Sequence, residues 1–187
     1  RSRHDRTVPA LQDVSFTVPR GTVLGVIGRN GAGKSTLLRV IAGILAPDRG
    51  RVVVRGRIST LLSVGVGFDA NLTGRENIKL GGHHTMSSGL LSALAGGRRA
   101  RDEEDALRAE IERRVIDFLE IDHIRHRSVD ALPYGLQKRV ELARALAMRP
   151  RVLMLDEPVA GMNREETEDM ARFILDVQEE WGVSVLL

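Results

Sequence analysis

The residues best suited to chemistry lie in one glycine-rich segment, Gly28-Arg-Asn-Gly-Ala-Gly-Lys-Ser35. The segment fits the spacing G-x-x-x-x-G-K-S/T without a mismatch. Glycines let a backbone wrap tightly, so that successive N–H groups point at one centre and bind phosphate oxygens. A predicted strand precedes the segment and a predicted helix follows it, and the dipole at a helix N-terminus attracts anions. The pattern therefore predicts a phosphate-binding loop.

The last residues of this loop have individual roles in phosphate chemistry. Lys34 would place a positive charge near the β- and γ-phosphates of a nucleotide, and the Ser35 hydroxyl would be a ligand of Mg²⁺. The residues that we expect to contact the phosphates are Gly28, Arg29, Asn30, Gly31, Ala32, Gly33, Lys34, Ser35 and Thr36.

Two acidic residues follow a second apolar segment, Val152–Leu155. A buried strand of this kind would deliver Asp156 to the carboxyl edge of a parallel sheet, beside the phosphate loop. There Asp156 would hold Mg²⁺ through water, and Glu157 would polarise the attacking water as the catalytic residue. A strand that ends at a surface acid pair is the alternative, and the phosphate loop upstream makes that alternative the weaker one.

Strand-like and helix-like segments alternate along the chain, which favours an α/β domain with a largely parallel sheet. We expect an ATP-binding core in residues 1–80 and 150–187, with a helical subdomain inserted at 81–149. Asn163 with Glu166 would cap a helix that ends at Gly182. The predicted strands are 14–18, 23–27, 51–55, 57–62, 152–155 and 183–187, and the predicted helices are 35–45, 73–80, a charged helix from 102, 136–148 and 163–181.

Composition excludes several classes of protein. The chain of 187 residues has no cysteine, which rules out disulfide frameworks and thiolate chemistry. No apolar run reaches the length that crosses a bilayer, and the first residues lack the apolar region of a signal peptide. The chain does not begin with Met, so it is expected to be an excerpt of a longer cytoplasmic protein. Its basic front half and its pI of 9.9 leave a polyanionic partner open as an alternative to solvated surface arginines.

A third motif, Leu132-Pro-Tyr-Gly-Leu-Gln-Lys138 followed by Glu141-Leu-Ala-Arg-Ala-Leu146, precedes the acidic strand end. With the phosphate loop and the Asp-Glu pair, in this order, the chain resembles the ATP-binding cassette (ABC) family over essentially its whole length. The resemblance implies a P-loop NTPase core, ATP hydrolysis with Mg²⁺, and a homodimer that binds ATP between its two subunits. The phosphate loop of one subunit and Gly135 of the other, in trans, would then bind the same ATP.

The resemblance also implies membrane-spanning permease subunits as partners, a peripheral place on the cytoplasmic face of the cell membrane, and no nucleic-acid partner. Residues 10–80 resemble ATPases of polysaccharide and teichoic-acid exporters, including Leu72-Thr-Gly-Arg-Glu-Asn-Ile78. Residues 86–187 resemble ATPases of branched-chain amino acid importers, including Glu157-Pro-Val-Ala-Gly-Met-Asn163.

Two internal positions depart from the family pattern. Pro133 occupies the place of the signature serine, which removes a hydroxyl and a backbone N–H. Ser63 or Val64 stands where the family has a glutamine. Because of these departures, an ATP-binding module with weak intrinsic hydrolysis remains an alternative function. The high pI leaves a second alternative, a non-transport ABC-type ATPase that acts on nucleic acid or ribosomes. We expect negligible hydrolysis from these residues alone.

Overall fold

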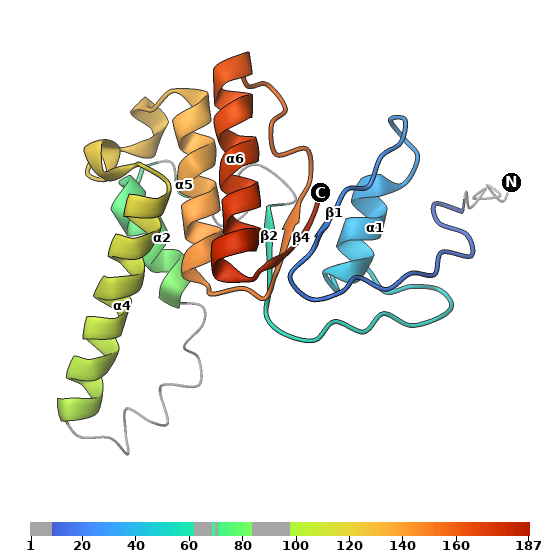
Figure 1. The fold of residues 1–187 in the computed structure, drawn as a ribbon, viewed down its shortest axis with the longest axis horizontal. Coiled ribbons are helices and arrows are strands. Elements are labelled where there is room, and N and C mark those ends of the chain that lie inside the picture. The colour runs from blue at the N-terminus through green and yellow to red at the C-terminus, as the bar shows by residue number, and fades with distance from the viewer. Residues whose placement is uncertain (1–8, 62–68, 70, 84–97) are drawn as a thin grey trace, which may run out of the picture.

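The computed structural model describes residues 9–61, 69, 71–83 and 98–187 (Figure 1). Its described strands form one parallel sheet in the order β1-β4-β3-β2. The sheet confirms the predicted α/β class. The strands are β1 (Val23–Leu24), β2 (Ile58–Leu61), β3 (Val152–Leu155) and β4 (Ser184–Leu186).

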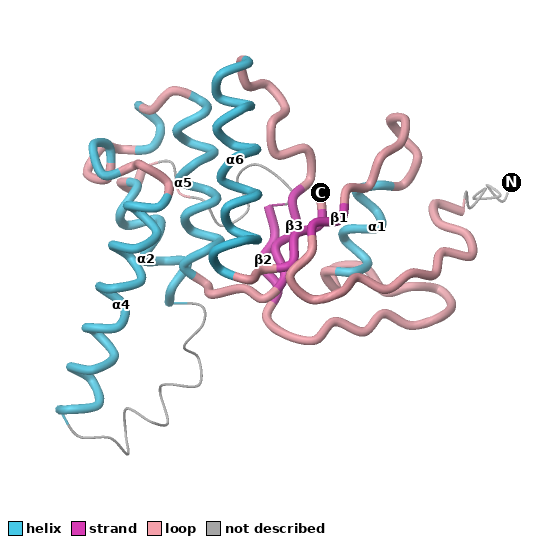
Figure 2. Tube along the Cα trace, viewed as in Figure 1, coloured by secondary structure: helices cyan, strands magenta, loops and turns pink. Residues whose placement is uncertain are grey.

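Helices cover both faces of this sheet (Figures 1 and 2). The helix α1 lies on one face, whereas α5 and α6 lie on the other and separate the sheet from α2 and α4. The helices are α1 (Lys34–Ile41), α2 (Gly74–His83), α4 (Arg98–Phe118), α5 (Tyr134–Ala147) and α6 (Arg164–Trp181), with short 3-10 turns η2 (Asp122–Ile124) and η3 (Val129–Ala131).

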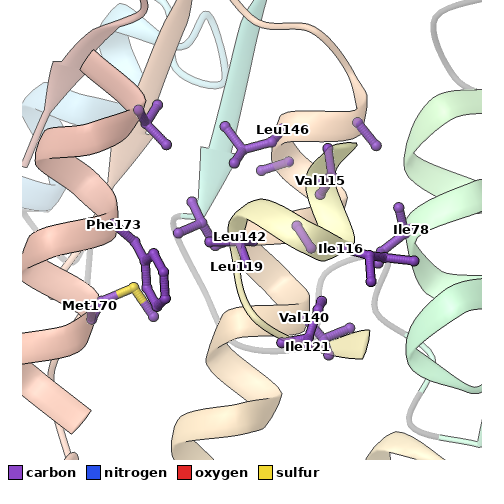
Figure 3. Packing of buried hydrophobic residues seen from close by; sticks show 14 of the residues in the cluster. Ile78, Val115, Ile116, Leu119, Ile121, Val140, Leu142, Leu146, Met170 and Phe173 are labelled. Atoms are coloured by element: carbon purple, nitrogen blue, oxygen red, sulfur yellow. The ribbon is translucent and has the colours of Figure 1, made fainter. Parts of the chain in front are cut away.

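Alternation along the central strands divides the core into two clusters. Leu153 and Leu155 belong to the larger cluster with α5 and α6, while Met154 between them packs with Leu38 of α1. Successive side chains of a strand point to opposite faces, so β3 is buried on both sides. Figure 3 shows the larger cluster, where side chains of α2, α4, α5 and α6 meet.

Helix ends follow the local signals in the sequence. The Asn163 side chain accepts a hydrogen bond from the Glu166 N–H, and the Glu166 carboxylate accepts one from the Asn163 N–H, so the predicted capping box of α6 is confirmed. Gly182 ends α6 in the left-handed conformation, with φ of 62°.

A second capping box begins α2, where the backbone N–H and the hydroxyl of Thr73 both donate to the Glu76 carboxylate. These bonds lower the pKa of Glu76, and the bond from the Thr73 backbone N–H contributes most. The cap is therefore present at neutral pH and is lost only as the pH falls through that lowered value.

Two predicted strands were wrong, and one predicted helix is shorter than expected. Residues 14–18 and 51–55 are not strands, and Val14, Phe16 and Val53 are exposed. A strand-like segment forms a strand only where another strand supplies hydrogen bonds, and none of the described strands pairs with these segments. The helix expected over 35–45 ends at Ile41, because Gly43 takes a left-handed conformation with φ of 74° and stops it before Pro47.

The charged helix begins earlier than expected, at Arg98 rather than at Asp102. Of its apolar side chains, Val115 is fully buried, and Ile111 and Phe118 are half-buried. The beginning of the subdomain expected over 81–149 lies outside the described residues at 84–97, and α2 extends into it as far as His83.

We predict that Leu146→Ala lowers the free energy of unfolding by about 2–5 kcal/mol, the usual cost of a cavity in a packed core. Leu146 is fully buried in the cluster around α5. The control Leu175→Ala, at a side chain of α6 that is 51% exposed, should change it by less than about 0.5 kcal/mol. Urea denaturation followed by circular dichroism measures both, and equal losses would contradict the assignment of the core.

Candidate active site

The phosphate loop predicted from the sequence connects β1 to α1. Its backbone turns through two positive φ angles, 81° at Gly31 and 95° at Gly33, a conformation that side chains other than glycine rarely adopt. Gly33 also approaches another part of the backbone, because a Cβ there would lie 2.6 Å from the carbonyl oxygen of Ala10. Glycine is therefore required at Gly33 for both conformation and space.

The first turn of α1 presents open hydrogen-bond donors. The first helical bond runs from the Leu37 N–H to the Gly33 carbonyl oxygen. The N–H groups of Lys34, Ser35 and Thr36 donate to no acceptor in the described part of the chain. The first turn of α1 also contains no acidic residue that would compete for its positive end. This arrangement suits an anion such as phosphate.

The Lys34 ammonium folds back over the loop. Its Nζ donates to the carbonyl oxygens of Gly28 at 2.8 Å and Arg29 at 3.3 Å. A cation is thus held beside the open amides by neutral acceptors. A phosphate group could replace these carbonyls with a charged acceptor, and charge-assisted hydrogen bonds are the stronger kind.

The acidic strand end meets the start of α1, as the sequence predicts. The Ser35 hydroxyl donates to Asp156 Oδ1 at 3.0 Å, across 121 residues of chain. Two features position the carboxylate. The Asp156 N–H donates to the Leu61 carbonyl oxygen, which extends the β2–β3 ladder, and Met154 packs against Leu38 of α1.

A hydroxyl and a carboxylate oxygen side by side suit Mg²⁺, a hard cation that prefers oxygen ligands. Among the described residues there is no group of three or more His, Cys, Asp and Glu side chains that could hold a metal. Mg²⁺ usually binds one or two protein groups and fills its other positions with water and phosphate oxygens. Ser35 and Asp156 therefore fit that ion as a pair.

Glu157 follows directly and is exposed. Its backbone takes a left-handed conformation with φ of 50°, which is uncommon for a residue other than glycine. Its carbonyl oxygen accepts a hydrogen bond from the Ala160 N–H, so a tight turn begins at this residue. The strained position changes the direction of the chain directly after Asp156.

Gly135, expected to act in trans, is the second residue of α5 and is buried. Pro133 is the N-cap of α5 and makes no side-chain capping hydrogen bond. Figure 1 shows α5 and α1 on opposite faces of the sheet, so the two helices belong to different sides of the protein. The glutamine position expected at Ser63 or Val64 lies outside the described residues.

The sequence did not identify two polar side chains with structural contacts, one in α2 and one at the start of α6. Asn77 is fully buried, and its side-chain amide donates to the carbonyl oxygens of Asp69, Leu72 and Thr73. Glu166 was assigned to a helix cap alone, but its side chain also lies against Gly135. Asn77 could have been identified as a polar residue on the apolar face of a helix. No pattern in the sequence near Glu166 indicates its contact with Gly135.

The chain is similar to known proteins over most of its length. The profile of the family described as "ABC transporter" matches residues 11–160. The methionine import ATP-binding protein MetN 1 of Rhodopseudomonas palustris is 39% identical over 185 residues, which cover 96% of this chain and 48% of that protein. The O-antigen export system ATP-binding protein RfbB of Myxococcus xanthus is 32% identical over 187 residues, which cover 100% of this chain and 39% of that protein.

A solved structure, a nucleotide-free ATP-binding cassette from an ABC transporter, has a TM-score of 0.74 and 28% identity, and covers 95% of this chain and 74% of that chain. This agreement confirms the predicted P-loop NTPase fold. The chain spans about half or less of the length of the two curated relatives.

We predict that Lys34→Ala weakens ATP binding about 10- to 100-fold, the loss of charge-assisted hydrogen bonds worth about 1.5–3 kcal/mol. The control is Arg39→Ala, which removes an exposed cation from the last turn of the same helix. Isothermal titration with ATP and Mg²⁺ measures both variants. If Lys34→Ala binds ATP as tightly as the parent chain does, the assignment of the phosphate loop is wrong.

Proposed function

The chain belongs to the ABC transporter family of ATP-binding domains, and from this premise we propose that it drives solute movement across a membrane by binding and hydrolysing ATP. The observation that carries this proposal is the hydrogen bond from Ser35 to Asp156. It joins the end of the phosphate loop to the acidic strand end, which are the two parts that phosphoryl transfer requires next to each other.

Each part of the site would contribute by position and charge. The amides of residues 28–36 and the Lys34 ammonium would bind the phosphate oxygens of ATP. Ser35, directly, and Asp156, through water, would hold Mg²⁺, which neutralises charge on the phosphates when it is bound. The Glu157 carboxylate, next to Asp156 and exposed, would accept a proton from the attacking water and orient it.

The proposed partners are a second copy of the chain and membrane-spanning permease subunits. In the pair, Gly135 of one copy would contact the ATP bound to the phosphate loop of the other. The protein would lie peripherally on the cytoplasmic face of the cell membrane. None of the described helices is long and apolar enough to cross a membrane. The relatives named for import and for export support a transport role, and they do not favour the alternative of an ATPase acting on nucleic acid or ribosomes.

We predict that Glu157→Gln lowers ATP turnover by about 100-fold or more, the usual contribution of a general base, and leaves ATP binding within about twofold. Release of phosphate by the full-length protein with its membrane partner measures turnover, and titration with ATP measures binding. Unchanged turnover would show that Glu157 is not the catalytic carboxylate.

A second candidate, a module that binds ATP and hydrolyses it weakly, is favoured by Pro133. This N-cap residue supplies neither a hydroxyl nor a backbone N–H to an anion at the start of α5. We predict that Pro133→Ser raises turnover about 5- to 10-fold, as expected for one recovered hydrogen bond. Pro47→Ser, in an exposed loop, is the control. No gain from Pro133→Ser would remove the support for this second candidate.

A further inference from the structure

We propose that Glu166 is a positioning residue that couples the signature turn, residues 133–135, to the catalytic segment, residues 157–163. In a pair of chains the signature turn would serve the partner's ATP and the catalytic segment would serve the chain's own ATP. Glu166 would therefore link the two nucleotide sites through a single chain. The consequence for turnover rests on the proposed function, whereas the contact itself does not.

The first observation is the close approach of Gly135 to Glu166. A Cβ added to Gly135 would lie 2.4 Å from Oε1 of Glu166, 2.5 Å from Cδ and 2.8 Å from Cγ. Real Cβ atoms do not come so close to other heavy atoms, because van der Waals repulsion rises steeply below about 3.5 Å. Only glycine therefore fits at this position while the Glu166 side chain keeps its place.

The Glu166 side chain is held in that place by its own helix. Its carboxylate accepts a hydrogen bond from the Asn163 N–H at 3.0 Å, and its backbone N–H donates to the Asn163 side chain at 3.0 Å. The side chain is half-buried. Turning this carboxylate away from Gly135 would break its hydrogen bond from the Asn163 N–H, which is one of the two bonds of the capping box.

A second approach joins the signature turn to the catalytic segment itself. The ring of Tyr134 lies near Gly161, where an added Cβ would be in ordinary van der Waals contact, 3.4 Å from Tyr134 Cε1. Gly161 also has a positive φ of 80°. Lys138 also lies over the Tyr134 ring, with its Nζ 5.6 Å from the ring centre. The signature turn thus touches the catalytic segment at one end and the cap of α6 at the other.

The chain connects these contacts to the catalytic carboxylate. The catalytic segment begins at Glu157, in its strained left-handed conformation, and ends at Asn163, which holds Glu166. A hydrogen bond from the Ala160 N–H to the Glu157 carbonyl oxygen keeps the segment compact. A shift of the signature turn toward α6 would therefore press on the Glu166 side chain, which is hydrogen-bonded to the end of this segment at Asn163.

Thermal unfolding of the full-length protein tests the contact. Gly135→Ala is expected to lower the unfolding midpoint by about 2–10 °C, as overpacking does. In the Glu166→Ala background the same change should leave the midpoint equal or raise it, because alanine favours a helix over glycine once the space is free. Glu166→Asp, which is shorter by one methylene, serves as the background if Glu166→Ala does not fold. An equal loss in all backgrounds would overturn the contact.

Steady-state hydrolysis and ATP binding test the coupling. Glu166→Ala is expected to lower kcat about tenfold, since small misplacements of reacting groups cost about this much, and to leave the Kd for ATP within about twofold. Glu166→Gln should keep kcat within about threefold of the parent, because its amide oxygen can still accept from the Asn163 N–H. Glu165→Ala, which removes another acid from the first turn of α6, is the matched control and should change neither quantity.

The outcomes separate this inference from the function on which it rests. A parent protein that hydrolyses no ATP would overturn the proposed function, while the reversal in the unfolding midpoint would still be measurable. A parent with normal turnover whose Glu166→Ala variant keeps its kcat would overturn the coupling. A loss of kcat in Glu166→Gln equal to that in Glu166→Ala would also overturn it, because the effect would then depend on charge rather than on position.

Discussion

The site depends on one tertiary constraint, the parallel pairing of β3 between β2 and β4. This pairing ends β3 beside the N-terminus of α1, so that Asp156 accepts a hydrogen bond from Ser35. The strand can occupy the centre of the sheet because apolar side chains cover both of its faces. Burial of β3 thus supplies the free energy that holds a carboxylate next to open amides and a cation.

The face of the sheet opposite α1 holds the helix that begins with the signature motif. Helix α5 is buried between the sheet and the helices α2 and α4, and its first turn carries the signature motif. An ion pair joins α5 to α6, where Arg139 pairs with Asp169 and lies over the ring of Phe173. Pro133 and Tyr134 of the signature turn are exposed, whereas Gly135 is buried against Glu166, so movement at Gly135 would reach α6 directly.

Local signals in the sequence predicted the parts of the structure that form over a few residues. The turn from Gly28 to Ser35 and the capping box of Asn163 with Glu166 depend on near neighbours, and both form as predicted. The strands expected over 14–18 and 51–55 failed, because a strand exists only when a distant segment supplies its hydrogen bonds. An alternating pattern in one segment contains no information about that partner.

By itself the sequence determined which groups are candidates for the chemistry: a glycine-rich turn with Lys34 and Ser35, a strand that would deliver Asp156, and a glycine in the signature. The tertiary structure decided which of these meet. The Ser35–Asp156 contact spans 121 residues, and Gly135 meets Glu166 across two elements. Motifs reflect short-range backbone requirements, whereas such distances follow from how strands pair and helices pack, which the whole chain decides together.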